Sequence, residues 1–320
     1  MPPVIETVNL TKVYEGALRG QDVKALQNLT IAIEEREIFG YLGPNGSGKT
    51  TTIKMLLGLI FPTSGDIRIM GKTDIGAAAI RKSIGYLPEG AYYPDFLRGE
   101  EILRFYGQLY GLSGKNLEKR IDATLELVGM TRARKRLLRG YSKGMRQRIG
   151  LAQALLHDPK ILILDEPTTG LDPVARKEIR DMLVRLRSEG KSLLISSHEL
   201  LEVELISDRV GILFEGVLQT LGTIQELLAD RDVTVDTAGV TDAAIRALGE
   251  RGIISDDVIE GKARFRVPPS LSIYDALEVM KSQNLTIVGV APRRETLEEL
   301  FVRVVGEARL RRDNEGKKAS

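Results

Sequence analysis

Apolar residues gather in short stretches, broken by turn residues, along about the first 230 residues of the chain. Stretches with alternating or continuous apolar character are typical of β-strands, whereas a helical repeat of apolar positions is typical of helices. Strands are predicted at 5–10, 29–33, 37–42, 66–70, 84–87, 161–164, 192–196 and 209–214. Helices are predicted at 49–57, 173–188 and 223–228. Strands that alternate with helices indicate the α/β fold class for this part of the chain.

The segment between residue 99 and about residue 139 has a different pattern. Its apolar positions recur with helical periodicity, it carries many charges, and it has little strand character. We therefore expect an inserted helical subdomain at about 90–156, within a first domain that covers residues 1–229.

From about residue 230 the order of the predicted elements changes. The pattern predicts a strand at 233–236, a helix at 241–248, a hairpin of 257–260 and 264–267 turning at Gly261 and Lys262, a helix at 271–282 and a strand at 285–290. The order β-α-β-β-α-β is typical of a small α+β ferredoxin-like domain. We place this accessory domain at 230–308, after a boundary at 229–232. It ends in an amphipathic helix at 297–305, and a charged, disordered tail is expected at 309–320.

The composition narrows the classes of function. The 320 residues include no cysteine, which excludes disulfides and thiolate metal sites. They include only two histidines, His157 and His198, which argues against a histidine metal site, and His157 is interpreted as a plain turn or helix-end residue. A formal net charge of +2 provides no basic field, so no nucleic-acid partner is expected.

Two observations bear on location. The N-terminus lacks the basic and then apolar pattern of a signal peptide. The longest apolar run, at 55–61, is far shorter than the roughly 20 residues that a membrane-spanning helix needs. We therefore expect a soluble, cytoplasmic protein, and if it works at a membrane, another polypeptide must supply the span.

Residues 43–50, the predicted phosphate loop, read Gly-Pro-Asn-Gly-Ser-Gly-Lys-Thr. They follow a predicted strand and open a predicted helix. Glycines allow backbone amides to surround phosphates, and the helix N-terminus adds positive partial charge. Lys49 would reach the β- and γ-phosphates, and Thr50 would coordinate Mg²⁺. The predicted nucleotide-binding residues here are Gly43, Pro44, Asn45, Gly46, Ser47, Gly48, Lys49, Thr50 and Thr51. The alternative, a glycine turn before a helix, gives this pattern by chance in roughly one or two per cent of such chains.

Two acids, Asp165 and Glu166, end an apolar strand, where α/β proteins place their ligand sites. Asp165 would hold Mg²⁺ and Glu166 would polarise the attacking water. An acid pair alone is more often a solvated strand end, but the phosphate loop favours the catalytic interpretation. His198 follows the predicted strand at 192–196 and would reach the γ-phosphate, although a lone histidine there is more often a surface or capping residue.

The segment Tyr141-Ser142-Lys143-Gly144-Met145 lies between the phosphate loop and the acidic strand. With these motifs in this order, the first 230 residues or so resemble the nucleotide-binding subunit of an ABC transporter. In that family this segment is the signature motif, usually Leu-Ser-Gly-Gly-Gln. The resemblance implies that Ser142 and the Gly144 backbone bind the γ-phosphate of ATP held by another protomer. Ser142 is also a suitable helix N-cap residue, and the N-terminus of a helix that has such a cap is also a good binding site for anions.

The resemblance assigns three further positions. Tyr14 corresponds to the aromatic residue that stacks on adenine, although a core residue at a strand end is the alternative. Asp172 corresponds to the residue that makes the contact in the loop crossing the dimer interface of that family. Glu89 lies in the lid loop, Tyr86-Leu87-Pro88-Glu89, where the family usually has glutamine, and a carboxylate there can still contact Mg²⁺ or water. With Lys143 and Met145, these variants resemble the exporter-like branch, whose members move drugs, antibiotics or lipids.

The prediction is thus a P-loop ABC ATPase that uses ATP and Mg²⁺. Catalytic roles are expected for Lys49, Glu166 and His198, and Mg²⁺ ligation for Thr50, Asp165 and Glu89. The expected partners are a second ATPase subunit, forming a homodimer, and a polytopic permease that holds the protein on the cytoplasmic face of the membrane.

Two other classes compete with this prediction. One is a non-transport ABC ATPase of translation, DNA repair or chromosome organisation, whose relatives usually carry two ATPase halves or a long coiled coil. The other is a kinase or GTPase, which leaves the signature segment unexplained. For the accessory domain, which has no catalytic cluster, we predict a regulatory or dimer-stabilising role.

Overall fold

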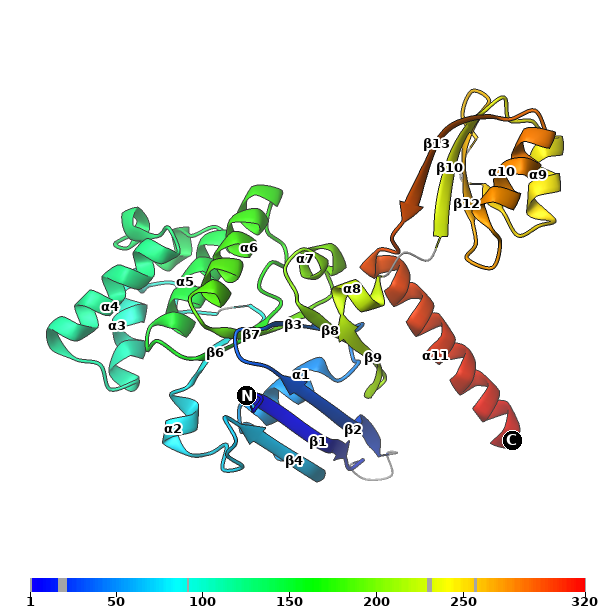
Figure 1. Cartoon of the computed structure of the whole chain (residues 1–320). Coiled ribbons are helices and arrows are strands. Elements are labelled where there is room, and N and C mark those ends of the chain that lie inside the picture. Colours follow the sequence, from blue (N-terminus) through cyan, green and yellow to red (C-terminus); the bar gives the residue numbers. More distant parts are fainter. Residues whose placement is uncertain (1, 17–21, 91, 229–231, 256–257, 320) are drawn as a thin grey trace. The chain divides into compact units, whose positions relative to one another are not determined.

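The computed structural model describes residues 2–16, 22–90, 92–228, 232–255 and 258–319 of the chain (Figure 1). The chain divides into two compact units. The first comprises residues Met1–Ile224 and Arg303–Ser320, and the second comprises Gln225–Val302. The division falls a few residues before the predicted boundary at 229–232, of which residues 229–231 lie outside the described part of the chain.

The first unit is built on a six-stranded sheet with the order β5-β6-β7-β3-β8-β9. Its strands are β3 (Ile38–Leu42), β5 (Ile84–Leu87), β6 (Ile161–Asp165), β7 (Ser192–Ser197), β8 (Arg209–Phe214) and β9 (Val217–Thr223). All neighbours are parallel except β8 and β9, which form an antiparallel hairpin. Every residue of β3, β6 and β7 is buried, as expected for strands covered on both faces. The parallel strands therefore direct their carboxyl ends to one edge of the sheet.

A second, three-stranded antiparallel sheet has the order β2-β1-β4. Its strands are β1 (Ile5–Tyr14), β2 (Val23–Ile33) and β4 (Ser64–Ile69). Ile5 and Leu29 of this sheet share one buried core with Phe39 of β3 and Ile53 of α1 (Lys49–Leu56). The helix that follows the phosphate loop is thus fixed by the packing of both sheets.

The predicted helical subdomain contains α3 (Gly99–Leu109), α4 (Gly114–Leu127) and α5 (Lys143–Leu155). A second core joins apolar side chains of these helices to α6 (Pro173–Ser188) and to the sheet. Leu103, Ile121 and Ile149 are fully buried in it. Two short helices that the sequence did not predict, α2 (Ala78–Arg81) and α7 (Leu200–Glu204), lie outside this subdomain, and Ile80 of α2 is buried in the core shared by the two sheets.

The second unit is a ferredoxin-like domain. Its elements are β10 (Asp232–Ala238), α9 (Asp242–Gly249), β11 (Ile254–Ser255), β12 (Lys262–Val267), α10 (Ile273–Ser282) and β13 (Thr286–Arg293). The antiparallel sheet has the order β11-β12-β10-β13, and Val235, Phe265 and Met280 lie in its core. The strand that pairs with β12 is β11, at Ile254–Ser255. Of the predicted strand at 257–260, residue 257 lies outside the described residues, and Ile259 forms a bridge with Lys262 across the predicted turn.

The last helix, α11, runs from Leu297 to Ala319. It starts before the division at Arg303 and ends in the part assigned to the first unit. Where a disordered tail was expected at 309–320, the structure continues this helix to Ala319. Residues of high helix propensity, such as Arg, Lys, Glu and Ala, account for the continuation. Two tertiary contacts add to it, because the Arg309 guanidinium lies 5.6 Å from the ring of Phe214 and Arg312 forms an ion pair with Glu215.

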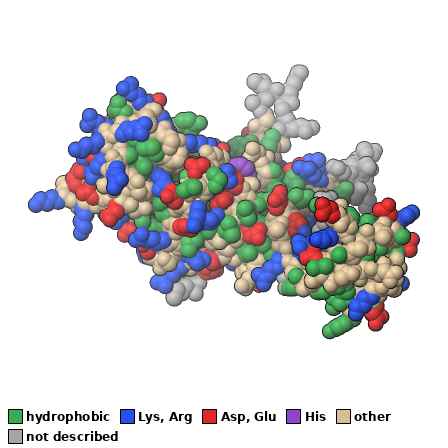
Figure 2. All heavy atoms as spheres, turned by 90° about the horizontal axis from the view of Figure 1, so that it is seen from above, with side chains coloured by type: hydrophobic (Ala, Val, Ile, Leu, Met, Phe, Trp, Pro, Cys, Tyr) green, Lys and Arg blue, Asp and Glu red, His purple; other side chains and the backbone are tan. Residues whose placement is uncertain are grey.

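Across the described residues, no helix is both long and apolar enough to span a bilayer. On the face shown in Figure 2, acidic and basic side chains are interspersed.

Candidate functional site

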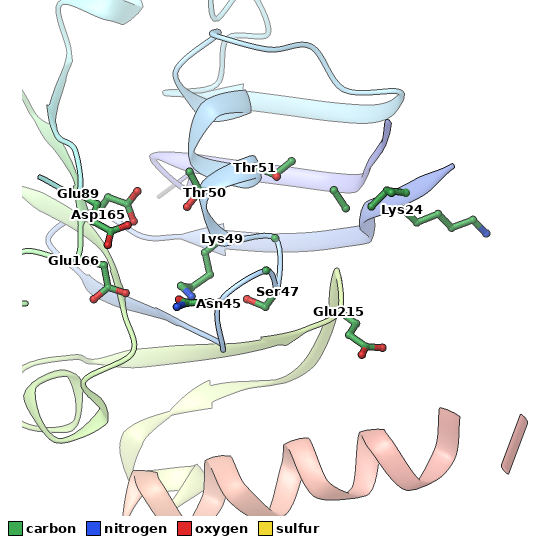
Figure 3. A pocket seen from close by; sticks show the side chains of 14 residues that line it. Lys24, Asn45, Ser47, Lys49, Thr50, Thr51, Glu89, Asp165, Glu166 and Glu215 are labelled. Atoms are coloured by element: carbon green, nitrogen blue, oxygen red, sulfur yellow. The ribbon is translucent and has the colours of Figure 1, made fainter. Parts of the chain in front are cut away.

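A cavity of about 380 Å³ opens beside the phosphate loop in the first unit (Figure 3). Residues from the loop, from the start of β2, from the lid loop and from the end of β6 surround it. They are Val23, Lys24, Ala25, Asn45, Gly46, Ser47, Gly48, Lys49, Thr50, Thr51, Glu89, Asp165, Glu166 and Glu215. The structure thus brings the predicted loop and the predicted acids to one site.

The phosphate loop takes its shape from glycine and from contacts with its surroundings. Gly48 has a φ of +108°, and a Cβ there would stand 2.5 Å from the Ala25 carbonyl oxygen. The Lys49 ammonium donates to the carbonyls of Gly43 at 2.6 Å and Pro44 at 3.2 Å. Burial lowers the pKa of Lys49, while the charges of Glu166, Asp165 and Glu89 oppose this shift. The lysine is therefore held in the cavity, facing the acids.

Two features of the loop fit a bound phosphate group. The Ser47 hydroxyl is buried and lacks a hydrogen-bond partner among the described residues. Within the described part of the chain, no side chain caps the N-terminus of α1, so its first amides are free of side-chain acceptors there. A phosphate oxygen would satisfy both groups, since buried polar atoms need partners and helix N-termini attract anions. The residues present therefore fit a nucleoside triphosphate.

Asp165 lies at the end of β6, beside Ser196 of β7. The Ser196 hydroxyl donates to Asp165 Oδ1. Burial raises the pKa of Asp165, and the Ser196 hydrogen bond opposes that rise. A carboxylate in this state gains from a cation, and Figure 3 shows Thr50, Glu89 and Asp165 close to one another.

These groups are compatible with Mg²⁺, which is usually bound by one or two carboxylates together with phosphate oxygens and water. In the part of the chain that the structure describes, no group of three or more His, Cys, Asp or Glu residues is arranged to hold a metal alone. Asp165, Glu89 and the Thr50 hydroxyl could therefore complete a Mg²⁺ shell only together with a nucleotide.

Glu166 is buried and has a φ of 54°, which is unusual for a residue with a side chain. Its Oε2 atom lies 2.8 Å from His198 Nδ1 and accepts a hydrogen bond of 2.8 Å from the Thr169 hydroxyl. His198 is half exposed, and its backbone amide also points to Oε2, at 3.4 Å. The two predicted catalytic residues are thus in contact, and Thr169 is a neighbour that sequence analysis did not predict.

The signature segment lies outside the phosphate cavity. Ser142 caps α5 by accepting a hydrogen bond from the Met145 amide at 3.2 Å, and Gly144 lies in the first turn of that helix. Lys143 lines a second cavity of about 550 Å³, with Arg146, Gln147, Glu89, Gly90, Tyr92, Glu166 and Thr169. Asp172 caps α6 by accepting from the Val174 and Ala175 amides. Ser142 and Asp172 therefore have cap roles in their own chain.

Tyr14 is not among the residues that line the phosphate cavity. It is 42% exposed at the end of β1, opposite Val23, and the Lys12 ammonium lies 5.2 Å from its ring centroid. Val23, Lys24 and Ala25 line the cavity instead. Sequence analysis missed them because it began this strand at residue 29, whereas β2 begins at Val23. Glu215 was missed for a similar reason, since β9 and its tight turn were not predicted.

The chain is similar to known proteins over most of its length. The family model for ABC transporter matches residues 26–169. An uncharacterized ABC transporter ATP-binding protein of Synechocystis sp. is 39% identical over 95% of this chain and 85% of its own length. A bacitracin transport ATP-binding protein of Bacillus licheniformis is 35% identical over 96% of this chain and 98% of its own. A solved dimeric ATP-binding cassette, in a post-hydrolysis state with ADP and Pi, has a TM-score of 0.63 and 25% identity, covering 69% and 98% of the two chains.

The fold, the phosphate cavity and these matches define a P-loop ATPase of the transporter class. The chain belongs to the family of ABC transporter ATP-binding proteins, the subunits that hydrolyse ATP to drive transport.

Proposed function

We propose that two copies of this chain close head to tail around two MgATP molecules and thereby power an exporter. The observation that carries the proposal is the separation of the site into two halves. Lys49, Asp165 and Glu166 meet at one cavity, whereas Ser142 and Gly144 are displayed outside it, at the N-terminus of α5. A second protomer would bring its signature segment to the γ-phosphate, as the predicted roles of these residues require.

Each residue in the cavity has a task that suits its position. Lys49, the Ser47 hydroxyl and the first amides of α1 hold the phosphates. Asp165, Thr50 and Glu89 would hold Mg²⁺, which when bound would supply positive charge beside the phosphates. Glu166 orients the attacking water and accepts its proton, while His198 supports Glu166 and faces the γ-phosphate. The buried environment strengthens these electrostatic interactions because water is largely excluded.

We further propose that a polytopic permease docks beside the lid loop, so that the protein works on the cytoplasmic face of the membrane. A groove of about 350 Å³ there is mainly apolar. It is lined by Leu57, Leu59, Ile75, Arg81, Ile84, Tyr86, Pro88, Tyr106, Tyr110 and Gln153. The similarity to a bacitracin transport protein favours an antibiotic or lipid-like cargo. An apolar groove next to Glu89 would transmit nucleotide state to the permease.

Glu166→Gln tests the catalytic role. The variant keeps the size and most hydrogen bonds of the side chain but cannot accept the proton of water. ATP binding should persist, hydrolysis should fall by at least about a hundredfold, and ATP should trap a dimer in size-exclusion chromatography. Glu189→Gln is the matched control, because Glu189 pairs with Arg185 on an exposed helix surface. Full hydrolysis by Glu166→Gln would remove the catalytic role.

Leu59→Glu tests the docking groove. Leu59 is 64% exposed and lines the groove, so a charge there should weaken docking without disturbing the ATP cavity. We expect unchanged basal ATPase activity but loss of co-purification with the membrane-spanning permease. Leu109→Glu is the control, since Leu109 is 67% exposed on α3 and does not line the groove. Equal co-purification of both variants would contradict the proposed surface.

A further inference from the structure

The Glu166 side chain accepts a hydrogen bond from Thr169, a residue in the turn that follows β6. The Thr169 hydroxyl donates to Glu166 Oε2 at 2.8 Å, and the Thr169 amide approaches the Glu166 carbonyl oxygen at 3.4 Å. We propose that Thr169 is a positioning residue, which fixes one carboxylate oxygen of Glu166 so that the other stays directed at the attacking water. This inference rests on the proposed catalytic role of Glu166.

The contacts of the carboxylate are divided unequally between its two oxygens. Thr169 Oγ1, His198 Nδ1 and the His198 amide all converge on Oε2. Among the described residues, no donor to Oε1 is found. A general base needs an available oxygen in a defined direction, because proton transfer depends on heavy-atom geometry. The hydrogen bonds to Oε2 fix the direction of the carboxylate and leave Oε1 available as the base.

The backbone of Glu166 is already fixed, so the remaining freedom is in its side chain. Its positive φ is held by β6 and by a hydrogen bond of 3.0 Å from its amide to the Ser196 carbonyl oxygen. Strained residues of this kind persist only where the surrounding structure determines them. Glutamate still has three rotatable side-chain bonds, and a hydrogen bond to Oε2 restricts all of them at once. Thr169 thus complements the restraint of the main chain.

The turn that carries Thr169 packs against α5, the helix that begins in the signature segment of the same chain. Lys143 lies over Gly170, where an added Cβ would stand 2.0 Å from the Lys143 ammonium. Gly170 has a φ of +71°, which a residue with a Cβ adopts with strain. The next residue, Leu171, is buried and would be 3.6 Å from a Cβ on Gly144. Packing against the start of α5 therefore places the Thr169 hydroxyl.

The test is a pair of substitutions, Thr169→Val and Thr169→Ser. Valine keeps the shape of threonine but lacks the hydroxyl, whereas serine keeps the hydroxyl. We expect kcat for ATP to fall about tenfold in Thr169→Val, the size of one hydrogen bond to a charged group, with KM and the affinity for a non-hydrolysable ATP analogue unchanged. Thr169→Ser should retain most of the wild-type kcat. Thr286→Val, an exposed strand position in the second unit, is the matched control and should have no effect.

Two results would overturn the inference. Equal loss of kcat in Thr169→Val and Thr169→Ser would show that loop shape matters and the hydroxyl does not. An unchanged kcat in Thr169→Val, with hydrolysis abolished in Glu166→Gln, would reject the positioning role while the proposed function stands. Full hydrolysis in Glu166→Gln would instead reject the role of Glu166 itself. In single turnovers, adding Thr169→Val to Glu166→Gln should cause no further loss, because Thr169 acts through Glu166.

Discussion

Asp165 shows how a single residue of this site affects stability and function in opposite directions. Burial raises its pKa above the ordinary value, with the charges of Glu166 and Glu89 adding to the rise. A carboxyl whose pKa is higher in the folded than in the unfolded chain favours folding when protonated, and this contribution is lost as pH rises through the folded-state pKa. Ionisation of Asp165 as pH rises therefore lowers the stability of the nucleotide-free protein.

Asp165→Asn should consequently raise the melting temperature of the nucleotide-free protein at pH 7, because it removes the buried charge. The difference from wild type should shrink as pH falls toward the ordinary range of aspartate. ATP hydrolysis should fall at least about a hundredfold, since the proposed Mg²⁺ ligand is lost. Thermal unfolding between pH 5 and 8 checks the first expectation, and a steady-state assay checks the second. A lower melting temperature for the variant at pH 7 would contradict the argument.

Site residues differ in how far the sequence alone could identify them. Lys49, Thr50 and Asp165 were predictable because phosphate and Mg²⁺ impose particular residue types next to a strand or a helix start. Thr169 and Glu215 were not, because their positions depend on packing between segments distant in sequence. The Thr169 hydroxyl reaches Glu166 within a turn of three residues, and Lys143, from another element, lies over the neighbouring Gly170.

At the scale of elements, His157 connects the end of α5 to the sheet and to α3. Its ring is stacked on Tyr110 at a centroid distance of 3.8 Å, and Nε2 lies 3.0 Å from the carbonyl oxygen of Ile84 in β5. The interpretation of His157 as a plain turn residue was therefore incomplete. A turn residue gives no sequence signal for such contacts, because they depend on how α3 and β5 pack.

His157 should make stability depend on pH. Burial lowers its pKa, with Arg120 and Lys191 adding to the effect, while the Ile84 carbonyl and Asp158 oppose it. A histidine with a lowered folded-state pKa is protonated more readily in the unfolded chain, so stability falls as pH drops below about 6.5. Chemical unfolding at pH 7.5 and pH 5.5 should show this loss, and it should be smaller in His157→Gln. An identical pH slope in both proteins would contradict the assignment.

Elements whose sequence has a clear pattern of apolar residues were predicted well, and elements whose sequence has only a weak pattern were not. Strands β3 and β6 are nearly continuous apolar runs and β7 has an apolar centre at 193–195, and all three lie where the sequence placed them. Strand β9 was missed because most of its residues are only partly buried, so its sequence shows no regular alternation of apolar and polar positions. The continuation of α11 past residue 308 was missed because its charged sequence indicates solvent exposure, while helix propensity and contacts with Phe214 and Glu215 decide its structure.

At the scale of the whole molecule, the two units have separate hydrophobic cores. The ATPase cores include side chains of the sheets and of the helical subdomain, whereas the ferredoxin-like core consists of residues between Val233 and Ile287. The division assigns Arg303–Ser320 to the first unit, so removing everything after residue 229 would also delete part of the ATPase unit. A test of the predicted regulatory or dimer-stabilising role of the accessory domain must therefore retain α11.

Separate cores predict two unfolding transitions in calorimetry, since a domain with its own core unfolds cooperatively by itself. A non-hydrolysable ATP analogue with Mg²⁺ binds only the first unit and should stabilise only its transition. At a ligand concentration about 100 times Kd, this stabilisation amounts to about 2.7 kcal/mol. Val235→Asp, which places a charge in the ferredoxin-like core, should lower the other transition and leave the ligand-sensitive one in place. A single transition that both the ligand and Val235→Asp shift would show instead that the two units unfold as one cooperative body.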